Sequence, residues 1–321
     1  MAPTGRRVLV LGGTGFVGRS TCERLVRAGW TVRVPTRRLA HGRALQCLPT
    51  VELVQADVHD PAALDRLLAS CDAVINLVAI LHGRAADFER AHVALPRTLV
   101  GAMQRAGVRR LVHVSALGVG PDAPSNYLRS KTDGEAVLQG AGLALTVWRP
   151  SVIFGADDRF MNTFARLQAL APFVPLAGAH AQFQPVWVED VAAALWRSLE
   201  RLDTVGRSFE AAGPEVFTLA DLVRLAGRWA GQERRVIPLP DAVGRLQAAL
   251  MGLAPGEPLM SADNLDSMKR PNVASGNVPG LEAVGLTPAA LGAVAPLYLG
   301  QGRSGPGRHR FNGYRANARR V

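Results

Sequence analysis

Three side chains near the middle of the chain have the types and spacing needed for proton transfer to a carbonyl group. Ser115 follows the apolar run 110–114, and Tyr127 and Lys131 lie farther along with three residues between them. Residues four apart share one helical face, so the lysine should lower the tyrosine pKa toward neutrality and bond a ribose. A serine hydroxyl can orient the carbonyl. We therefore predict Ser115, Tyr127 and Lys131 as catalytic residues, with a solvated helix pair as the alternative.

The rarity of the residue types strengthens this prediction. The chain has three tyrosines and two lysines, Lys131 and Lys269. A tyrosine followed four residues later by a lysine should arise by chance only about 0.02 times.

A glycine-rich segment, Gly12-Gly13-Thr14-Gly15-Phe16-Val17-Gly18, follows the apolar run 8–11. Glycine permits a tight turn and lets backbone N–H groups approach a pyrophosphate, while the N-terminus of the next helix attracts negative charge. About 0.3 chance matches to this glycine spacing are expected, so its place after the first strand gives it weight. We predict a dinucleotide site that includes Gly12, Thr14, Gly15, Phe16, Val17 and Gly18, with a tight turn alone as the alternative.

The ends of later strands indicate which dinucleotide fits. A site for NAD(H) carries an acidic residue about 20 residues past the loop, where this chain has Thr36-Arg37-Arg38. Arg37 suits a 2′-phosphate, so the sequence favours NADP(H) over NAD(H). The other expected cofactor contacts are Asp57, Val58, Leu77, Val78, Ala79, Tyr127, Lys131, Pro150 and Ile153. For Asp57, a turn before the next helix explains the residue about equally well.

The substrate side is less determined by the sequence. Pro150, Ser151 and Ile153 are expected beneath the nicotinamide, and His82 or Arg159 can point into the adjoining cleft. Packing or loop roles are the alternative for each. The site should open at the carboxyl ends of the strands.

These residues fall on alternating strand and helix patterns, which indicate a doubly wound parallel sheet of the Rossmann type with a smaller C-terminal α/β appendage. We expect strands at 8–11, 31–34, 51–54, 73–78, 110–114 and 144–148, with strand-like runs at 183–188 and 235–238. We expect helices at 16–28, 61–70, 88–106, 127–139, 160–170, 191–201, 219–230, 241–251 and 288–299. Pro96 should kink the third helix or mark its start, and residues 254–285 should be mostly loop.

Three segments follow from this pattern. Residues 1–150 are expected to form the NADP(H)-binding domain, and residues 151–300 a smaller substrate or partner domain interleaved with the last elements of the sheet. Residues 301–321 are expected to be a basic, disordered tail.

Composition narrows the protein class. With 321 residues, 48% hydrophobic and 20% charged, the chain is typical of a globular protein. It has no apolar run of about 18 residues and no signal-peptide pattern, so we expect a cytoplasmic protein without a transmembrane segment. Cys22, Cys47 and Cys71 match no metal or redox motif, and we expect no metal site.

The net charge of +11 comes largely from arginine and is concentrated at the end of the chain. The final 21 residues hold six arginines and no acidic residue. Such a tail can contact an anionic membrane surface, nucleic acid or an acidic partner, or stay solvated. We expect no specific nucleic-acid binding, and peripheral contact with the inner face of a membrane is one hypothesis for the tail.

Several motifs together resemble the extended or atypical branch of the short-chain dehydrogenase/reductase superfamily. They are residues 12–18, 76–79, Ser115, Tyr127 with Lys131, and residues 149–155 and 188–191. Residues 75–82, 88–90, 115–118, 127–131 and 183–186 are more narrowly similar to bacterial relatives of the nucleotide-binding alpha-subcomplex accessory subunit (subunit nine type) of respiratory complex I. The similarity continues through residues 258–261 and 263–265, and so covers nearly the whole chain apart from the tail.

The resemblance implies bound NADPH, which in complex I is structural, whereas other members are reductases or are linked to ubiquinone biosynthesis. One hypothesis is therefore an NADP(H)-dependent oxidoreductase acting on a carbonyl or quinone-related compound. The second is a redox-silent accessory or assembly protein of a respiratory or quinone-biosynthesis complex. A nucleotide-sugar epimerase or dehydratase is a third, less favoured hypothesis.

Overall fold

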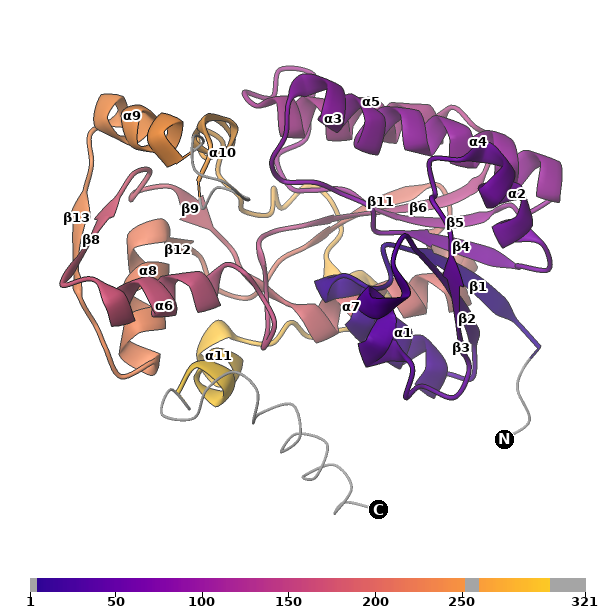
Figure 1. Ribbon diagram of the computed structural model, residues 1–321, viewed down its shortest axis with the longest axis horizontal. Helices are drawn as coiled ribbons and strands as arrows, with labels where there is room; N and C mark the ends of the chain where they lie inside the picture. Colours follow the sequence, from indigo (N-terminus) through magenta and orange to yellow (C-terminus); the bar gives the residue numbers. More distant parts are fainter. Residues whose placement is uncertain (1–4, 252–259, 301–321) are drawn as a thin grey trace, which may run out of the picture.

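The computed structural model describes residues 5–251 and 260–300, which are organised around one parallel β-sheet (Figure 1). Within these residues the sheet has seven strands in the order β11-β6-β5-β4-β1-β2-β3. The strands are β1 Arg7–Leu11, β2 Thr31–Thr36, β3 Val51–Gln55, β4 Ala73–Asn76, β5 Arg110–Val114, β6 Ala144–Pro150 and β11 Arg207–Ala211. The order reverses between β1 and β4, as in a doubly wound fold, so the predicted fold class is confirmed.

Helices cover both faces of the sheet, with α1 and α7 on one face and α2, α4 and α5 on the other (Figure 1). Their bounds are α1 Phe16–Arg27, α2 Pro61–Leu68, α3 Ala85–Glu89, α4 Leu95–Ala106, α5 Asn126–Gln139 and α7 Val188–Glu200. Capping residues explain where two of these helices start and end. Asp60 accepts a hydrogen bond from Ala62 N–H at the start of α2, and Gly107 ends α4 with φ +70°.

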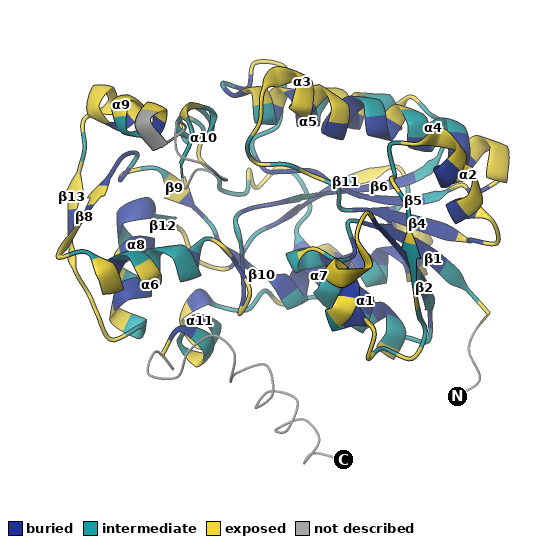
Figure 2. Cartoon of the chain, in the orientation of Figure 1, coloured by how far each residue is buried: buried dark blue, intermediate teal, exposed yellow. Residues whose placement is uncertain are grey.

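Strand β1 is buried on both faces, which explains its unbroken apolar sequence. Val8 and Val10 pack into the core under α1 and α7. Leu9 and Leu11 pack into the opposite core with α2, α4 and α5. The central strand that leads into the glycine-rich loop is therefore fixed from both sides (Figure 2).

The C-terminal part of the chain has a core of its own, formed by α6, α8 and α11 with short paired strands. Its elements are β7 Ile153–Phe154, α6 Met161–Leu170, β8 Phe173–Leu176, β9 Gln182–Phe183, β10 Val186–Trp187, β12 Phe217–Thr218, α8 Leu219–Trp229, β13 Arg235–Pro238, α9 Asp241–Met251, α10 Ala262–Ser267 and α11 Leu291–Leu299. Helix α7 and strand β11 return to the sheet. The boundaries proposed at residues 150 and 300 stay predictions.

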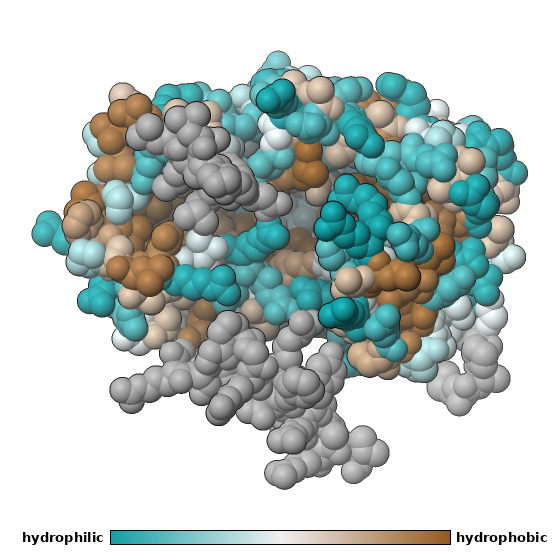
Figure 3. All heavy atoms as spheres, in the orientation of Figure 1, coloured by the Kyte–Doolittle hydropathy of each residue, from teal (hydrophilic) through white to brown (hydrophobic). Residues whose placement is uncertain are grey.

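Apolar side chains reach the surface over β8, β13 and α9 (Figure 3). Phe173, Ile237, Val243 and Leu246 are exposed there. None of the helices in the described residues is long and apolar enough to cross a bilayer.

The structure differs from the sequence expectations at particular elements. The predicted helix 88–106 is divided into α3, a π-helical turn Arg90–Ala94, and α4. Pro96 lies in the first turn of α4 and so marks a helix start, as predicted. Residues 260–285, the described part of the predicted loop region 254–285, are mostly loop, as predicted; they also include α10, which starts at a capping box of Ser261 and Asn264, and a 3₁₀ turn at Leu281–Val284. Strand β11 was missed, and the predicted strand 73–78 ends at Asn76. The tail at residues 301–321 lies outside the described residues.

Candidate functional site

The glycine-rich loop after β1 has a backbone that side chains would obstruct. Gly12 has φ +79°, a conformation that favours glycine. Gly15 N–H donates to the Gly12 carbonyl at 3.0 Å and closes the turn. A Cβ on Gly18 would overlap the Gly12 carbonyl oxygen and lie 2.6 Å from the Gly13 backbone. The loop and the first turn of α1 therefore pack backbone against backbone.

The N-terminus of α1 is open to an anion. In the described structure Gly15 provides no side-chain cap, and the first turn of α1 carries no acidic residue. Unsatisfied N–H groups and the helix dipole favour a phosphate at such a position. The loop therefore fits a pyrophosphate.

The other predicted loop residues lie around this turn. Val17 packs against the sheet core, and Thr14 is half-buried. The Phe16 ring lies beside Gly155, where a Cβ would come within 3.1 Å of the ring. A Cβ on Gly12 would lie 3.2 Å from the Leu77 carbonyl carbon, so the segment after β4 runs against the loop.

The ends of β2 and β3 lie on the other side of the loop. Arg37 and Arg38 are exposed after β2, and Asp57 is exposed after β3. Arg90 lies 4.0 Å from Asp57 in an ion pair that the sequence did not predict. His59 N–H donates to the Asp57 carboxylate, so the turn proposed for Asp57 is present. Val58 packs into the core beneath α2 and α4.

Ser115 follows the carboxyl end of β5, and Lys131 reaches the same strand end from α5. Ser115 is 4% exposed, and within the described residues its hydroxyl has no hydrogen-bond partner. Lys131 is 2% exposed and donates from Nζ to the Val114 carbonyl at 3.0 Å. Tyr127 lies one turn before Lys131 on α5, on the same face. A buried hydroxyl without a partner is rare and destabilises the folded state. The Ser115 hydroxyl is therefore suited to donate a hydrogen bond to an acceptor atom of a ligand.

The pKa values correct one expectation. Burial raises the pKa of Tyr127 to about 12, so its phenol is not shifted toward neutrality. Burial lowers the pKa of Lys131 to about 8, against the opposing effect of Glu135. Desolvation of the phenol, and not the charge of the lysine, determines this pKa. At neutral pH Tyr127 is protonated and can donate a proton.

Two buried histidines beside this group were missed as site residues. His92, in the π-helical turn, approaches Ser130 Oγ through Nδ1 at 2.8 Å and accepts from Ile80 N–H through Nε2 at 3.1 Å. His113, on β5, approaches Asn76 Nδ2 through Nδ1 at 3.3 Å. The sequence signal for His92 was Pro96, which interrupts the predicted helix four residues later. The interruption is a π-turn in the structure, and π-turns often occur at functional sites.

Both histidines stay neutral in the folded protein. Burial, and then the nearby Lys131, lowers the pKa of His92 to about 3. Burial also lowers the pKa of His113 well below its usual range. The unfolded chain binds these protons below its ordinary histidine pKa of about 6.5, and the folded chain does not.

Acid should therefore destabilise the protein from about pH 6.5 downward, toward the folded pKa of His92 at about 3. Each neutral buried histidine contributes a slope of at most about 1.4 kcal/mol per pH unit. Denaturant unfolding at several pH values between 4.5 and 7.5 measures this. A His92→Gln variant should show a shallower slope; an unchanged slope contradicts the assignment.

The start of α5 is anchored by the C-terminal part of the chain. The Asp263 carboxylate accepts from Asn126 N–H at 2.7 Å and from Tyr127 N–H at 3.0 Å. Ser267 Oγ donates to Ser125 Oγ at 2.8 Å. Helix α10 therefore fixes the helix end that carries Tyr127.

The remaining predicted residues border the site less directly. Pro150 ends β6 and is buried, and Ile153 is half-buried in β7. Ser151 donates from Oγ to Asn272, so its hydroxyl is already used. Val78 N–H donates to Asn76 Oδ1. Ala79 and Arg159 are exposed, and His82 is half-buried.

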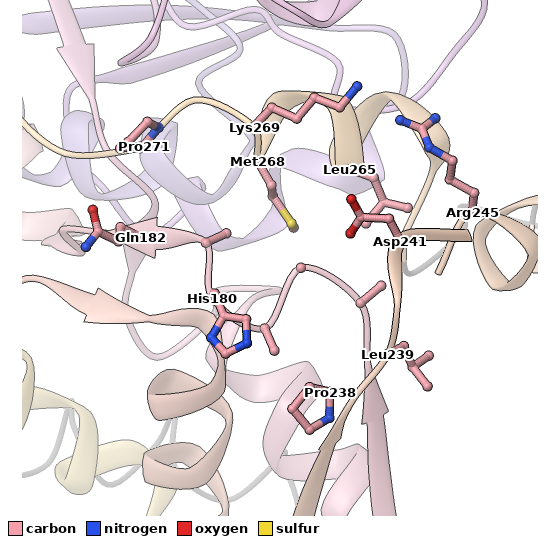
Figure 4. Close-up of a pocket in the computed structure, with 14 residues that line it drawn as sticks. His180, Gln182, Pro238, Leu239, Asp241, Arg245, Leu265, Met268, Lys269 and Pro271 are labelled. Atoms are coloured by element: carbon pink, nitrogen blue, oxygen red, sulfur yellow. The ribbon is translucent and has the colours of Figure 1, made fainter. Parts of the chain in front are cut away.

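A cavity of about 430 Å³ lies on the other side of α10, among residues of the C-terminal part. Met268 points into it from the end of α10, and Asp241 faces it from the start of α9 (Figure 4). Arg245 and Lys269 at its rim share the Asp266 carboxylate. The residues that line the cavity do not include Ser115, Tyr127 or Lys131. No group of three potential metal ligands occurs in the part of the chain that the structure describes.

Comparison with known families agrees with this geometry. Residues 8–212 match the NAD dependent epimerase/dehydratase family. The chain belongs to this family. The family and the fit of the loop make a nicotinamide dinucleotide the ligand of this site.

Two relatives are similar to most of this chain. The chain is 33% identical over 289 residues to mitochondrial NADH dehydrogenase (ubiquinone) 1 alpha subcomplex subunit 9 of Mus musculus, covering 88% of this chain and 76% of that one. It is 30% identical to the ceramide reductase of Caulobacter vibrioides, covering 73% and 74% of the two chains. The resemblance predicted from the sequence, to the short-chain dehydrogenase/reductase superfamily and to the complex I accessory subunit, is confirmed.

Solved structures support the fold. A dTDP-glucose 4,6-dehydratase from Streptomyces venezuelae, DesIV, which has NAD bound, aligns with a TM-score of 0.72 at 20% identity. The alignment covers 91% of this chain and 95% of that chain. At 20% identity this similarity shows a shared fold alone.

Proposed function

We propose that this protein is an NADP(H)-dependent reductase that converts a carbonyl group to an alcohol, or a quinone to a hydroquinone. The observation that supports this proposal is the buried Ser115 hydroxyl, which has no hydrogen-bond partner among the described residues. Lys131, one helical turn from Tyr127, donates to the carbonyl of the adjoining Val114. The relative named ceramide reductase supports a reductase role.

In this proposal each side chain has one task. Ser115 donates its hydroxyl hydrogen to the substrate carbonyl oxygen and so orients it. Tyr127, protonated at neutral pH, transfers its proton to that oxygen as the bond order falls. Lys131, whose pKa of about 8 leaves it mostly charged at pH 7, stabilises the resulting phenolate. When bound, the nicotinamide supplies the hydride, so one hydride and one proton complete the reduction.

The test starts from the purified protein. Native mass spectrometry identifies a nucleotide that stays bound, and NADPH oxidation is then followed with a panel of ketones, aldehydes and quinones. Consumption of NADPH with formation of the alcohol or hydroquinone supports the proposal. Bound NADPH with no turnover across the panel overturns it.

The choice between NADPH and NADH is tested at Arg37, the exposed cation after β2. We expect NADPH to bind at least about tenfold more tightly than NADH, which is about 1.4 kcal/mol. Arg37→Asp should reverse the preference, because the carboxylate repels a 2′-phosphate and accepts from a 2′-hydroxyl. Calorimetry measures both affinities. Arg43→Asp makes the same charge change as a control, because Arg43 is an exposed arginine of the 3₁₀ turn Leu39–Leu45 that follows β2. Equal affinities in the wild type contradict the prediction.

A second candidate is a redox-silent accessory protein whose bound nucleotide stabilises the fold. The similarity to the complex I subunit over 88% of this chain favours it. The exposed apolar residues over β8, β13 and α9 also suit a protein partner. Under this proposal NADPH raises the melting temperature but is not consumed. Contact of the basic tail with an anionic membrane stays a prediction from charge.

A further inference from the structure

His92 connects two segments that approach the proposed site from different sides. Its Nε2 accepts from Ile80 N–H, in the segment that follows β4. Its Nδ1 faces Ser130 Oγ on α5. The ring is 3% exposed and lies edge-on to the Tyr127 ring, with centroids 5.6 Å apart.

The direction of these hydrogen bonds follows from the donors. Nε2 accepts a backbone N–H, so the neutral ring carries its hydrogen on Nδ1 and donates it to Ser130 Oγ. Ser130 then donates its own hydrogen to the Tyr127 carbonyl at 2.8 Å. One continuous chain of donors therefore runs from Ile80 through His92 and Ser130 to Tyr127.

The π-helical turn that carries His92 is packed tightly against α5. A Cβ on Gly134 would overlap the His92 carbonyl oxygen, so only glycine fits there without movement. His92 is thereby held at its backbone by α5 and at its ring by Ser130 and Ile80. The arrangement has little freedom to shift.

The segment held by Ile80 borders the dinucleotide loop. Leu77 N–H donates to the Leu11 carbonyl at 3.0 Å, and Leu77 packs against Gly12. Arg37 and Asp57 follow β2 and β3, on one side of β1, whereas this segment follows β4, on the side of β5. A dinucleotide that crosses the loop with its adenosine over β2 places its nicotinamide half along residues 77–80.

We propose that His92 is a positioning residue that holds the segment 77–80 and the Tyr127 helix in register around the nicotinamide half of the cofactor. The inference rests on the proposed function only in requiring NADPH in this loop. Replacing His92 should weaken the binding of the nicotinamide half of NADPH and leave the binding of the adenosine half unchanged. A residue with a merely structural role would affect both halves together.

The experiment compares two ligands by calorimetry on the full-length protein. NADPH contacts both halves of the site, and 2′,5′-ADP contacts the adenosine half alone. His92→Phe keeps the ring packing and removes both hydrogen bonds, so NADPH affinity should fall about fivefold or more while 2′,5′-ADP affinity stays within about twofold. His92→Gln, whose Oε1 can accept from Ile80 N–H, should restore part of the loss.

Two further variants complete the test. Ser130→Ala breaks the same chain from α5 and should reproduce the selective loss even if His92→Phe does not fold. Thr146→Val removes a buried hydrogen bond to Thr204, toward the amino end of β6, and controls for general destabilisation.

Equal losses for both ligands in the His92 and Ser130 variants, or no loss, overturn the positioning role. A wild type that binds 2′,5′-ADP and NADPH but reduces nothing overturns the proposed reductase and leaves the positioning role standing. A wild type that binds neither ligand overturns both.

Discussion

Replacing Tyr127 with phenylalanine is expected to lower turnover by about 10²-fold to 10⁴-fold, the range that general acids contribute. The phenol is the proposed proton donor, and its raised pKa of about 12 keeps it protonated throughout the neutral range. Phenylalanine keeps the ring contacts with His92 and Phe88 and removes only the hydroxyl. NADPH affinity should therefore change little.

The measurement is NADPH oxidation with the best substrate of the panel, paired with calorimetric binding of NADPH. Tyr298→Phe serves as the matched control, because that phenol donates to Asp158 and holds α11 against the loop after β7. It should lower stability but not the proton-transfer step. A Tyr127→Phe protein with turnover near that of the wild type contradicts the assignment of the proton donor.

Changing Gly18 to alanine is expected to remove most of the dinucleotide affinity, with a loss of about 100-fold or more, equivalent to about 2.7 kcal/mol. The new Cβ would overlap the Gly12 carbonyl and approach the Gly13 backbone, so the loop has to move. Any movement displaces the N–H groups that would bind the pyrophosphate.

Gly292→Ala is the control, because among the described residues a Cβ there meets nothing within 4 Å. Calorimetry with NADPH measures the affinity, and thermal unfolding without nucleotide separates loss of binding from loss of fold. An unchanged NADPH affinity of the Gly18→Ala protein contradicts the proposal that this loop binds the pyrophosphate.

The sequence predicted those features that local chemistry determines. The glycine loop follows a strand and starts a helix, and Tyr127 and Lys131 are one helical turn apart. Both patterns depend on a few neighbouring residues. The doubly wound sheet follows from the repeated alternation of apolar runs and amphipathic stretches.

Features that depend on distant residues could not be predicted in the same way. Asp263 caps α5 from 137 positions beyond Asn126, and no local pattern links the two. The pKa of Tyr127 was expected to fall because of Lys131, but burial raises it. Burial depends on the tertiary packing around the ring. Strand β11 was missed because Arg207-Ser208-Phe209-Glu210-Ala211 has only one large apolar side chain.

The capping of α5 by Asp263 also sets an order of events during synthesis of the chain. All the residues proposed to bind the dinucleotide have left the ribosome soon after residue 153. Asp263 follows Asn126 by 137 residues, which at 5–20 residues per second takes about 7 to 27 seconds. Helix α7 and strand β11, which complete the sheet and its cover, are synthesised within that interval, so the sheet can assemble while the Tyr127 helix still lacks its carboxylate cap. The helix that carries the proposed proton donor therefore receives its cap only after all strands of the sheet have been synthesised.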